Sequence, residues 1–522
     1  MRRTWLAAGV TAALALSLAG NTATAGPPAD LETHTAPPGR ADDSAAAGAE
    51  PMALESPENA GNKEVSLVEE LTPGLKGTFF PGWIEHAGCV FFTAFDGKRI
   101  RLYKIDPQGE VRKIAALGQY FAGGYSDPHF AVFQRELYFS AGRPGKEKAH
   151  LYKRSRDGNI SLVSDVGGDL GTFPQYMTVF RNALYFVAVG ASGARGLYRV
   201  NSAGGVEFVH PAEPIWSGTI FVEHRGEVYY AGLDPDAGIE LFKVRTDGTV
   251  VLAADINPDG NSSPSELTSW HGELYFNAFR PDVGFELFKL DRTGNVVLVA
   301  DINPGAGPEV DGYPKGSSEP GYLGGFVPFN GELYFKADAG DPIGPELHKI
   351  DRDGNVVLVA DINHTRKTDP SRTRANDGPD HFLTYHGELY FTTYGGGAIG
   401  RELYKVKQDG SVVLVADIDS SDKYGSDPRN LTPYQGSLYF SAYRTDVDGF
   451  ELFRLADDSV ELVKDINPKP DFGLVVPQAL VLGSPAKPVR SQFPVFRGDL
   501  YFGAVADPDV GKELYKYGPI GR

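Results

Sequence analysis

Residues 272–304 read GELYFNAFRPDVGFELFKLDRTGNVVLVADINP, and the parts of this stretch recur in fixed order from about residue 65 to residue 516. A first apolar run, 274–276 (LYF), is followed by a polar loop and a second run, 287–289 (LFK). A tight turn at 293–294 (TG) leads to a third run, 296–299 (VVLV). Short runs of β-branched and aromatic residues, separated by Gly, Asn, Asp and Pro, indicate buried β-strands. The stretch therefore predicts a repeated all-β unit.

Two elements of this unit occur nine times each. The Leu-Tyr-Phe element begins at Val90, Leu137, Leu184, Val228, Leu274, Leu333, Leu389, Leu438 and Leu500. The Leu-aromatic-Lys element begins at Leu102, Leu151, Leu197, Leu241, Leu287, Leu347, Leu403, Leu452 and Leu514. An apolar segment closed by a turn, such as 267–272 (LTSWHG), precedes the first element, which gives four strands in a unit of 44 to 62 residues. Four-stranded units with this period are typical of a β-propeller.

The two ends of the repeat region complement each other. The last unit stops at 513–516 (ELYK) and lacks its fourth strand, whereas residues 65–74 match residues 296–305 as a fourth strand without a unit. An N-terminal strand that completes the C-terminal blade closes a ring and removes exposed sheet edges. We therefore predict a single closed β-propeller of about nine four-stranded blades, with an open or split array as the alternative. Because propellers usually have four to eight blades, we expect one irregular unit, at 187–235, where the repeat is weakest.

Residues 286–294 (ELFKLDRTG) and 240–249 (ELFKVRTDGT), each followed by a Val-rich strand, resemble the bacterial ELWxxDGT-repeat proteins, often labelled hyalin-like. The resemblance extends over roughly residues 65–516, but Trp is replaced by Phe, Tyr or His, and only 240–249 keeps Asp-Gly-Thr. It implies a secreted or surface-attached bacterial protein, and it brings no catalytic residues.

The first 63 residues predict export and a tether. Arg2 and Arg3 precede an apolar stretch, and residues 23–25 (ATA) form a small-residue cleavage site, so we expect a signal peptide at 1–25. An apolar helix that stays in place is the alternative. Residues 26–63 contain almost no large apolar side chains, which predicts a flexible linker before a propeller domain at 64–522. No other stretch approaches 18 apolar residues, so we expect no membrane span.

Charge and cysteine content limit the partners and the source of stability. The single Cys89 excludes an intramolecular disulfide. The formal net charge of −18 becomes −20 when the two arginines of the leader are removed. This charge argues against nucleic acid or an anionic membrane as a partner.

Acidic residues recur at the end of the unit where strand 2 meets strand 3 and where strand 4 leads into the next unit. A two-residue hairpin at Asp247-Gly248 would pair positions that sum to 495 and place Glu240 opposite Asp255. Facing carboxylates suit a hard cation, so calcium is a candidate cofactor. The candidate ligands are Asp236, Glu240, Asp255, Asp282, Glu286, Asp301, Glu346, Asp361, Glu402 and Asp417.

Two other interpretations of these acids stay open. In one, the acids accept hydrogen bonds from backbone N–H groups or pair with the basic residue of strand 3, which is Lys or Arg in all nine units. A bulged turn would also shift the strand register by one residue and separate the acids.

A basic loop interrupts this acidic pattern. It contains Arg366, Lys367, Arg372 and Arg374, which we consider as a binding site for an anionic glycan or an acidic partner, with a solvated loop as the alternative. The sequence contains no H-E-x-x-H, G-x-S-x-G or P-loop motif and no Cys pair for zinc.

We therefore expect a secreted or cell-surface, non-catalytic binding protein, and a monomer. Its partner would be an extracellular glycan, a cell-wall component or a protein. The alternative is an extracellular polysaccharide hydrolase or lyase with its site at the propeller channel, because propellers can assemble sites from several blades.

Overall fold

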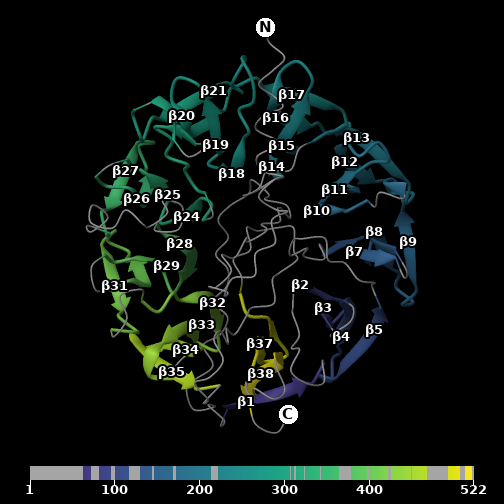
Figure 1. The fold of residues 1–522 in the computed structure, drawn as a ribbon, viewed down its shortest axis with the longest axis vertical. Helices are drawn as coiled ribbons and strands as arrows, with labels where there is room; N and C mark the ends of the chain where they lie inside the picture. The colour runs from purple at the N-terminus through teal and green to yellow at the C-terminus, as the bar shows by residue number, and fades with distance from the viewer. Residues whose placement is uncertain are drawn as a thin grey trace.

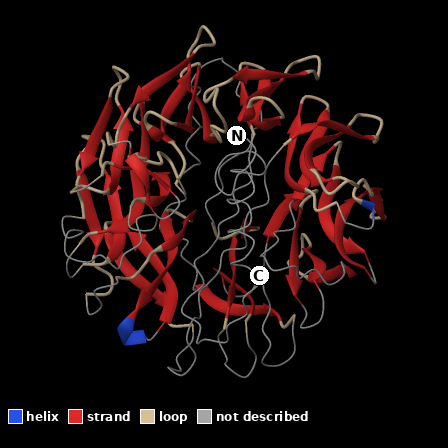
Figure 2. Cartoon of the chain, turned by 45° about the horizontal axis from the view of Figure 1, so that its top comes forward, coloured by secondary structure: helices blue, strands red, loops and turns tan. Residues whose placement is uncertain are grey.

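The computed structural model describes residues 63–71, 82–95, 100–116, 130–143, 146–168, 172–212, 221–305, 307–310, 313–322, 324–340, 342–363, 378–396, 399–420, 425–447, 449–466, 492–505 and 512–519. These residues form nine four-stranded antiparallel sheets arranged as the blades of a propeller around a ring (Figure 1). Strands account for nearly all of the regular structure in this part of the chain (Figure 2). The prediction of a nine-bladed, all-β propeller is confirmed.

In blades 1 to 8 the strands follow chain order, from the first strand near the centre to the fourth at the outside, and in blade 9 the N-terminal strand takes the fourth place. Blades 1 to 3 consist of β2 (Gly82–His86), β3 (Cys89–Phe95), β4 (Ile100–Ile105) and β5 (Val111–Ala116); β6 (Phe130–Phe133), β7 (Glu136–Arg143), β8 (Lys146–Arg154) and β9 (Ile160–Ser164); and β10 (Gln175–Phe180), β11 (Ala183–Val189), β12 (Arg195–Val200) and β13 (Val206–Pro211). Blades 4 to 6 consist of β14 (Val222–His224), β15 (Glu227–Asp234), β16 (Gly238–Val244) and β17 (Val250–Ala254); β18 (Ser265–Trp270), β19 (Glu273–Arg280), β20 (Gly284–Leu290) and β21 (Val296–Ala300); and β24 (Val327–Phe329), β25 (Glu332–Asp338), β26 (Pro345–Ile350) and β27 (Val356–Ala360). Blades 7 to 9 consist of β28 (Asp380–Tyr385), β29 (Glu388–Tyr394), β30 (Arg401–Val406) and β31 (Val412–Ala416); β32 (Arg429–Tyr434), β33 (Ser437–Arg444), β34 (Gly449–Ala456) and β35 (Ser459–Lys464); and β36 (Val495–Phe496), β37 (Asp499–Ala504), β38 (Glu513–Pro519) and β1 (Lys63–Glu69).

The ring closes through the two ends of the repeat region. Strand β1 pairs antiparallel with β38, with Leu67 opposite Tyr515. Just beyond β1, the Leu71 N–H donates to a carboxylate oxygen of Glu513 at 2.6 Å. An N-terminal strand therefore completes the C-terminal blade, as the sequence predicts.

The expectation of an irregular unit at 187–235 is wrong. The described residues of this region belong to blades 3 and 4, and each of these blades has four strands. The repeat weakens there in its side chains, whereas the strand pairing is kept. The crossover between blades 5 and 6 instead contains an additional hairpin of β22 (Gly307–Val310) and β23 (Tyr313–Lys315).

The two hairpin turns of a blade differ in length. Between strands 1 and 2 of blade 5, His271 and Gly272 have φ of 49° and 75°, and Trp270 pairs with Glu273. Positive φ at both positions defines a two-residue type I′ turn. Between strands 3 and 4 of blade 4, Val244 pairs with Val250, so the loop is longer than the two residues assumed. Gly248, with φ of 82°, provides the left-handed residue that such a loop requires.

The core lies between adjacent blades. Successive side chains of a strand point to opposite faces of its sheet, so Leu274 and Phe276 pack against Tyr229 of blade 4, whereas Tyr275 packs against Phe335 of blade 6. Burying a side chain the size of Leu or Phe contributes roughly 1.5–3 kcal/mol. Each blade therefore stabilises two seams.

Among the described residues, no helix is long and apolar enough to cross a membrane.

Candidate functional site

The loop rim is the end of the propeller where strand 2 meets strand 3 and where strand 4 leads into the next blade. At this rim, six blades carry a glutamate directly before the leucine that begins the Leu-aromatic-Lys element of strand 3. Each of these glutamate side chains is at most 1% exposed. They are Glu240, Glu286, Glu346, Glu402, Glu451 and Glu513.

Each buried glutamate connects chain segments through hydrogen bonds. The carboxylate of Glu240 accepts the N–H of Ile256 at 2.8 Å, the N–H of Ser262 at 2.9 Å and the hydroxyl of Ser262 at 2.6 Å. Ile256 follows strand 4 of the same blade, and Ser262 lies on the crossover to the next blade. The Ser262 carbonyl in turn accepts the N–H of Phe279 in that blade at 2.7 Å. We call this arrangement the carboxylate link; it recurs with Ser318 in blade 5 and Ser426 in blade 7.

The other predicted calcium ligands have different surroundings. Near the turn the strand positions sum to 494, and a bulge between Leu241 and Phe242 then restores the sum of 495 at the rim. Asp255, which follows the last paired residue, is nevertheless exposed, whereas Glu240 is completely buried. The two carboxylates therefore do not share one environment.

The remaining aspartates lie along the rim. Asp236, Asp282, Asp301 and Asp417 are exposed and Asp361 is partly exposed, and Asp282 accepts two hydrogen bonds from Arg280 at 2.6 and 3.0 Å. Among the described residues, no group of three or more His, Cys, Asp or Glu side chains could hold a metal ion. Calcium binding stays a prediction that solution measurements must test.

The strand-3 lysines bind a different set of acids. Lys243 contacts Glu227 at 2.7 Å, and Lys349 contacts Glu332 at 2.8 Å. Glu227 and Glu332 follow the turn between strands 1 and 2, at the end of the blade opposite the loop rim. The hydrogen bonds of the rim glutamates therefore come from N–H and hydroxyl groups rather than from these lysines.

Burial also changes the protonation of the rim glutamates. It raises the pKa of Glu286 to about 8 and that of Glu402 to about 7, against the hydrogen bonds that these carboxylates accept. The nearby Asp301 and Asp417 add a smaller increase in the same direction.

The basic loop proposed as a binding site, with Arg366, Lys367, Arg372 and Arg374, lies outside the described residues. The structure instead reveals charged and titratable side chains at the loop rim that the sequence did not predict. We call them the rim charge cluster; its members are Lys336, Asp380, His381, Arg401, Asp427 and Arg429.

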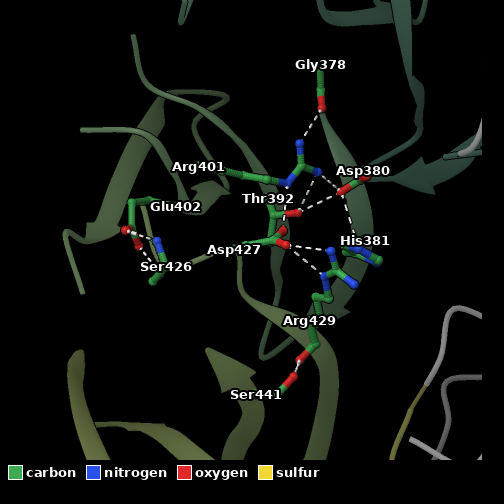
Figure 3. Close-up of polar contacts among 10 residues, drawn as sticks. All are labelled: Gly378, Asp380, His381, Thr392, Arg401, Glu402, Ser426, Asp427, Arg429 and Ser441. Carbon is green, nitrogen blue, oxygen red and sulfur yellow. Dashed lines mark hydrogen bonds and ion pairs between the residues drawn. The ribbon is translucent and has the colours of Figure 1, made fainter. Parts of the chain in front are cut away.

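Arg401 is the centre of the rim charge cluster (Figure 3). Its side chain is 7% exposed and bonds to Asp380 at the start of β28, and its Nε lies 3.1 Å from an oxygen of Asp427. The other oxygen of Asp427 accepts two hydrogen bonds from Arg429, at 2.9 and 2.6 Å. Arg401 also donates to the hydroxyl of Thr392 at 3.1 Å. The ion pairs therefore connect blade 7 to the crossover into blade 8 and to β32.

Lys336 extends the cluster to blade 6. It is 5% exposed, and a Cβ added at Gly378 would lie 2.6 Å from its Cδ, so its stem covers Gly378. The carbonyl of Gly378 accepts a hydrogen bond from Arg401 at 3.4 Å. Burial lowers the pKa of Lys336, and Asp380 partly offsets that effect.

The arginines keep both aspartates ionised. Burial alone would raise the pKa of Asp380, but Arg401 holds it well below its ordinary value. Asp427 shows the same balance, with Arg429 and Arg401 lowering its pKa. The side chains of Asp380, Asp427 and Arg429 are 24%, 25% and 30% exposed, so they also reach solvent.

A departure from the repeat could have identified this cluster in the sequence. Arg401 occupies the strand-3 position that is apolar in blades 4, 5 and 8, where Ile239, Phe285 and Phe450 stand, as the strand pairing shows. Lys336 likewise occupies the position of Asn277 in blade 5. Each is a charged residue at a position where its neighbouring blades are uncharged.

Comparisons with known proteins bear on the fold alone. No family model matches the sequence, and no curated protein matches it. A puromycin-hydrolyzing peptidase of Mycobacterium tuberculosis matches at 12% identity and a TM-score of 0.36, over 73% of this chain and 60% of its own. Dipeptidyl peptidase 4 of Porphyromonas gingivalis matches at 11% identity and a TM-score of 0.39, over 69% of this chain and 56% of its own.

The β-propeller domain of the Trilobed protease from Pyrococcus furiosus matches at 11% identity and a TM-score of 0.33, over 66% of this chain and all of its own. The chain spans about 60% of the length of the puromycin-hydrolyzing peptidase. Similarity at this level carries no activity over to this protein.

Proposed function

We propose that this protein is a secreted, non-catalytic binding propeller and that the rim charge cluster is its ligand-binding site. The observation that carries the proposal is the fixed arrangement of Asp380 and Asp427 on either side of Arg401. Both carboxylates are held ionised and oriented while their side chains still reach solvent. Acceptors with fixed geometry lose little conformational freedom when a ligand binds.

The protonation states favour binding over hydrolysis. Acid–base hydrolysis of a glycosidic bond needs one protonated and one ionised carboxyl group on the same site. In the rim charge cluster the pKa values of Asp380 and Asp427 are both lowered. Among the glutamates with raised pKa values, Glu240, Glu286 and Glu402 are completely buried in carboxylate links. Burial also raises the pKa of the partly buried Glu319, which interacts with the ammonium group of Lys336 rather than with Asp380 or Asp427.

The surrounding groups favour an uncharged, hydroxyl-rich glycan as the ligand. Tyr394 lies below Arg401, with 5.8 Å between the guanidinium carbon and the ring centre, and Tyr443 packs against Phe450. Both tyrosines are partly exposed. Aromatic rings provide an amphipathic surface, and Asp427 and Arg429 supply acceptors and donors for hydroxyl groups. The net charge of −18 disfavours an anionic polymer.

The test uses the chain without its leader, residues 26–522, on an array of extracellular and cell-wall glycans, followed by calorimetry. The proposal expects binding that weakens roughly tenfold or more in Asp427→Asn, because contacts at the centre of a site usually contribute above 1.4 kcal/mol. Asp446→Asn is the matched control, since Asp446 is an exposed rim acid that bonds Arg444 outside the cluster.

Three results would contradict parts of the proposal. Retention on proteins but on no glycan would make the partner a protein. Turnover of a polysaccharide that Asp427→Asn abolishes would favour the hydrolase or lyase alternative. Equal affinity of Asp427→Asn and Asp446→Asn would remove the site from the rim charge cluster.

A further inference from the structure

Tyr230 carries a hydroxyl that the repeat does not otherwise have. It occupies the third position of the Leu-Tyr-Phe element in blade 4, where the strand pairing places phenylalanine in the other blades. The equivalent residues are Phe92, Phe139, Phe186, Phe276, Phe335, Phe391, Phe440 and Phe502. Since phenylalanine packs this position in eight blades, the hydroxyl is not needed to fill the core.

The Tyr230 hydroxyl has no hydrogen-bond partner in the structure, although the side chain is completely buried. Tyrosines at the neighbouring position of the repeat differ in this respect. Tyr275, for example, donates to Glu273 at 2.8 Å, and Tyr334 donates to Glu332 at 3.0 Å. Buried polar groups without a partner are rare in native proteins, and an ordered water or ligand often satisfies them.

A second such group lies in the same seam. The Nδ1 atom of His210 in β13 is buried and also has no hydrogen-bond partner. The ring centres of His210 and Tyr230 lie 6.2 Å apart, with the rings edge to face. His210 pairs with Leu197, at the position that is alanine in five other blades: Ala115, Ala254, Ala300, Ala360 and Ala416.

A third departure from the repeat makes room for the histidine. The ring centres of His210 and Phe242 lie 4.6 Å apart. A Cβ at Gly232 would lie 2.6 Å from a ring carbon of Phe242, so that ring occupies space that a larger residue would take. The equivalent residue is alanine in blade 5 and blade 6, at Ala278 and Ala337. The packing around His210 and Tyr230 is therefore adjusted as a unit.

This seam is also one where the carboxylate link is missing. Blade 3 has Gly196 at the position of Glu240, so this position of its third strand carries no carboxylate. His210 belongs to blade 3 and Tyr230 to blade 4. A molecule held by both would supply a polar connection between these blades.

The two side chains also define the charge of such a molecule. Burial lowers the pKa of His210 and raises that of Tyr230, so both groups are neutral near neutral pH. Burying a charge between two neutral groups is costly, so an uncharged molecule suits this place best.

We propose that a small uncharged molecule able to donate and accept hydrogen bonds, which is water in the purified protein, binds between the Tyr230 hydroxyl and His210 Nδ1 and links blades 3 and 4. Buried waters usually bond to two to four polar partners that are otherwise unsatisfied. This link takes the place of the carboxylate link that Gly196 removes.

A high-resolution crystal structure of residues 26–522 tests the proposal directly. We expect one ordered molecule within hydrogen-bond distance of both atoms. An empty seam, or a direct bond between the Tyr230 hydroxyl and His210 Nδ1, would overturn the proposal.

Thermal unfolding of variants gives an independent test. Tyr230→Phe should lower the melting temperature by a few degrees, and His210→Phe, which keeps a ring against Phe242, should add little to that loss because both changes break the same link. Phe276→Tyr is the matched control, since it adds a hydroxyl to a seam that has Ala254 instead of a histidine, and it should also destabilise. An increase in melting temperature for Tyr230→Phe, or additive losses in the double variant, would show that the hydroxyl binds nothing.

Discussion

Glu286 and Asp301 lie at the same end of one hairpin but have opposite surroundings. Glu286 is completely buried and accepts hydrogen bonds from Ile302 and Ser318, whereas Asp301 is exposed. The burial of Glu286 is tolerated because backbone N–H groups at its link also need an acceptor. The first carboxylate therefore holds the fold together, and the second is available to solvent and ligands.

The raised pKa values of the carboxylate links predict that stability falls as the pH rises. Burial raises the pKa of Glu286 to about 8 and that of Glu402 to about 7, above the ordinary value of 4.5. Between these values the folded state holds protons that the unfolded chain releases, so raising the pH favours unfolding. We expect the melting temperature to fall by several degrees from about pH 5 to about pH 8.

The double variant Glu286→Gln and Glu402→Gln provides the control for this pH dependence. At acidic pH this variant should have a lower melting temperature than the wild type, because the NH2 group of each new amide then faces N–H donors. Its melting temperature should also change less with pH. Histidines with lowered pKa values, such as His210 and His348, act in the opposite direction in both proteins. A double variant whose profile has the same slope as the wild type would contradict the assignment of protonated links.

Calcium is expected to have no specific effect on stability. The glutamates predicted as ligands already accept hydrogen bonds from N–H and hydroxyl groups, as Glu240 does from Ile256 and Ser262. A bound ion that the unfolded chain does not hold would raise the melting temperature by mass action. Millimolar calcium should therefore shift the transition no more than magnesium at equal ionic strength. A calcium-specific increase of several degrees, reversed by EDTA, would establish a site among the rim aspartates.

At the scale of elements, Arg401 joins strands of blade 7 to the crossover into blade 8. Arg401→Leu leaves Asp380 and Asp427 without their shared cation in a largely buried site. Removing one partner of a buried ion pair costs about 3–5 kcal/mol. We expect a loss of about this size in chemical denaturation.

Arg280→Leu is the matched control for this loss. Arg280 bonds Asp282 on the exposed part of the loop rim of blade 5, where ion pairs contribute about 0–1 kcal/mol. Equal losses for Arg280→Leu and Arg401→Leu would show that the rim charge cluster is not a structural centre.

Strand β1 is the element on which ring closure depends. Deleting residues 63–71 removes the partner of β38 and the N–H that Leu71 donates to Glu513. The deletion exposes a strand edge and part of a seam that contains Leu71 and Trp83. We expect a sharp decrease in melting temperature and increased aggregation in light scattering. An unchanged melting temperature would contradict closure by this strand.

The elements could be predicted from the sequence because their periodicity is set by simple packing rules. Short apolar runs such as 274–276 predicted the strands. The unpaired fourth strand at 65–74 predicted that the N-terminal strand closes the ring. The environment of Glu240 could not be predicted, because it depends on a loop of five residues between Val244 and Val250, where two were assumed, and on a bulge that restores the register. Asp380 and Asp427 are far apart in sequence from Lys336, so only the stacking of blades brings that cluster together.

At the scale of the whole molecule, the carboxylate links divide the ring into two arcs. Blades 4 to 9 contain the six buried glutamates, whereas Arg101, His150 and Gly196 occupy the equivalent positions of blades 1 to 3. His150 keeps a contact with Thr172 at 3.3 Å, so blade 2 retains part of the connection. The seams among blades 1 to 3 are therefore expected to be weaker than those among blades 4 to 9.

Hydrogen exchange should reveal this difference. Breaking a hydrogen bond to a charged or buried group changes the free energy of opening by about 1–3 kcal/mol, and 1.4 kcal/mol corresponds to a tenfold change in exchange rate. Measured by mass spectrometry at a fixed pH, the strand-2 amides of β3 and β11 should exchange roughly tenfold faster than those of β19 and β33. Glu286→Ala should raise the exchange of β19 toward the level of β11, because it removes the link of that blade alone. Uniform protection around the ring, or slower exchange in blades 1 to 3, would mean that apolar packing rather than the carboxylate links determines where the propeller opens.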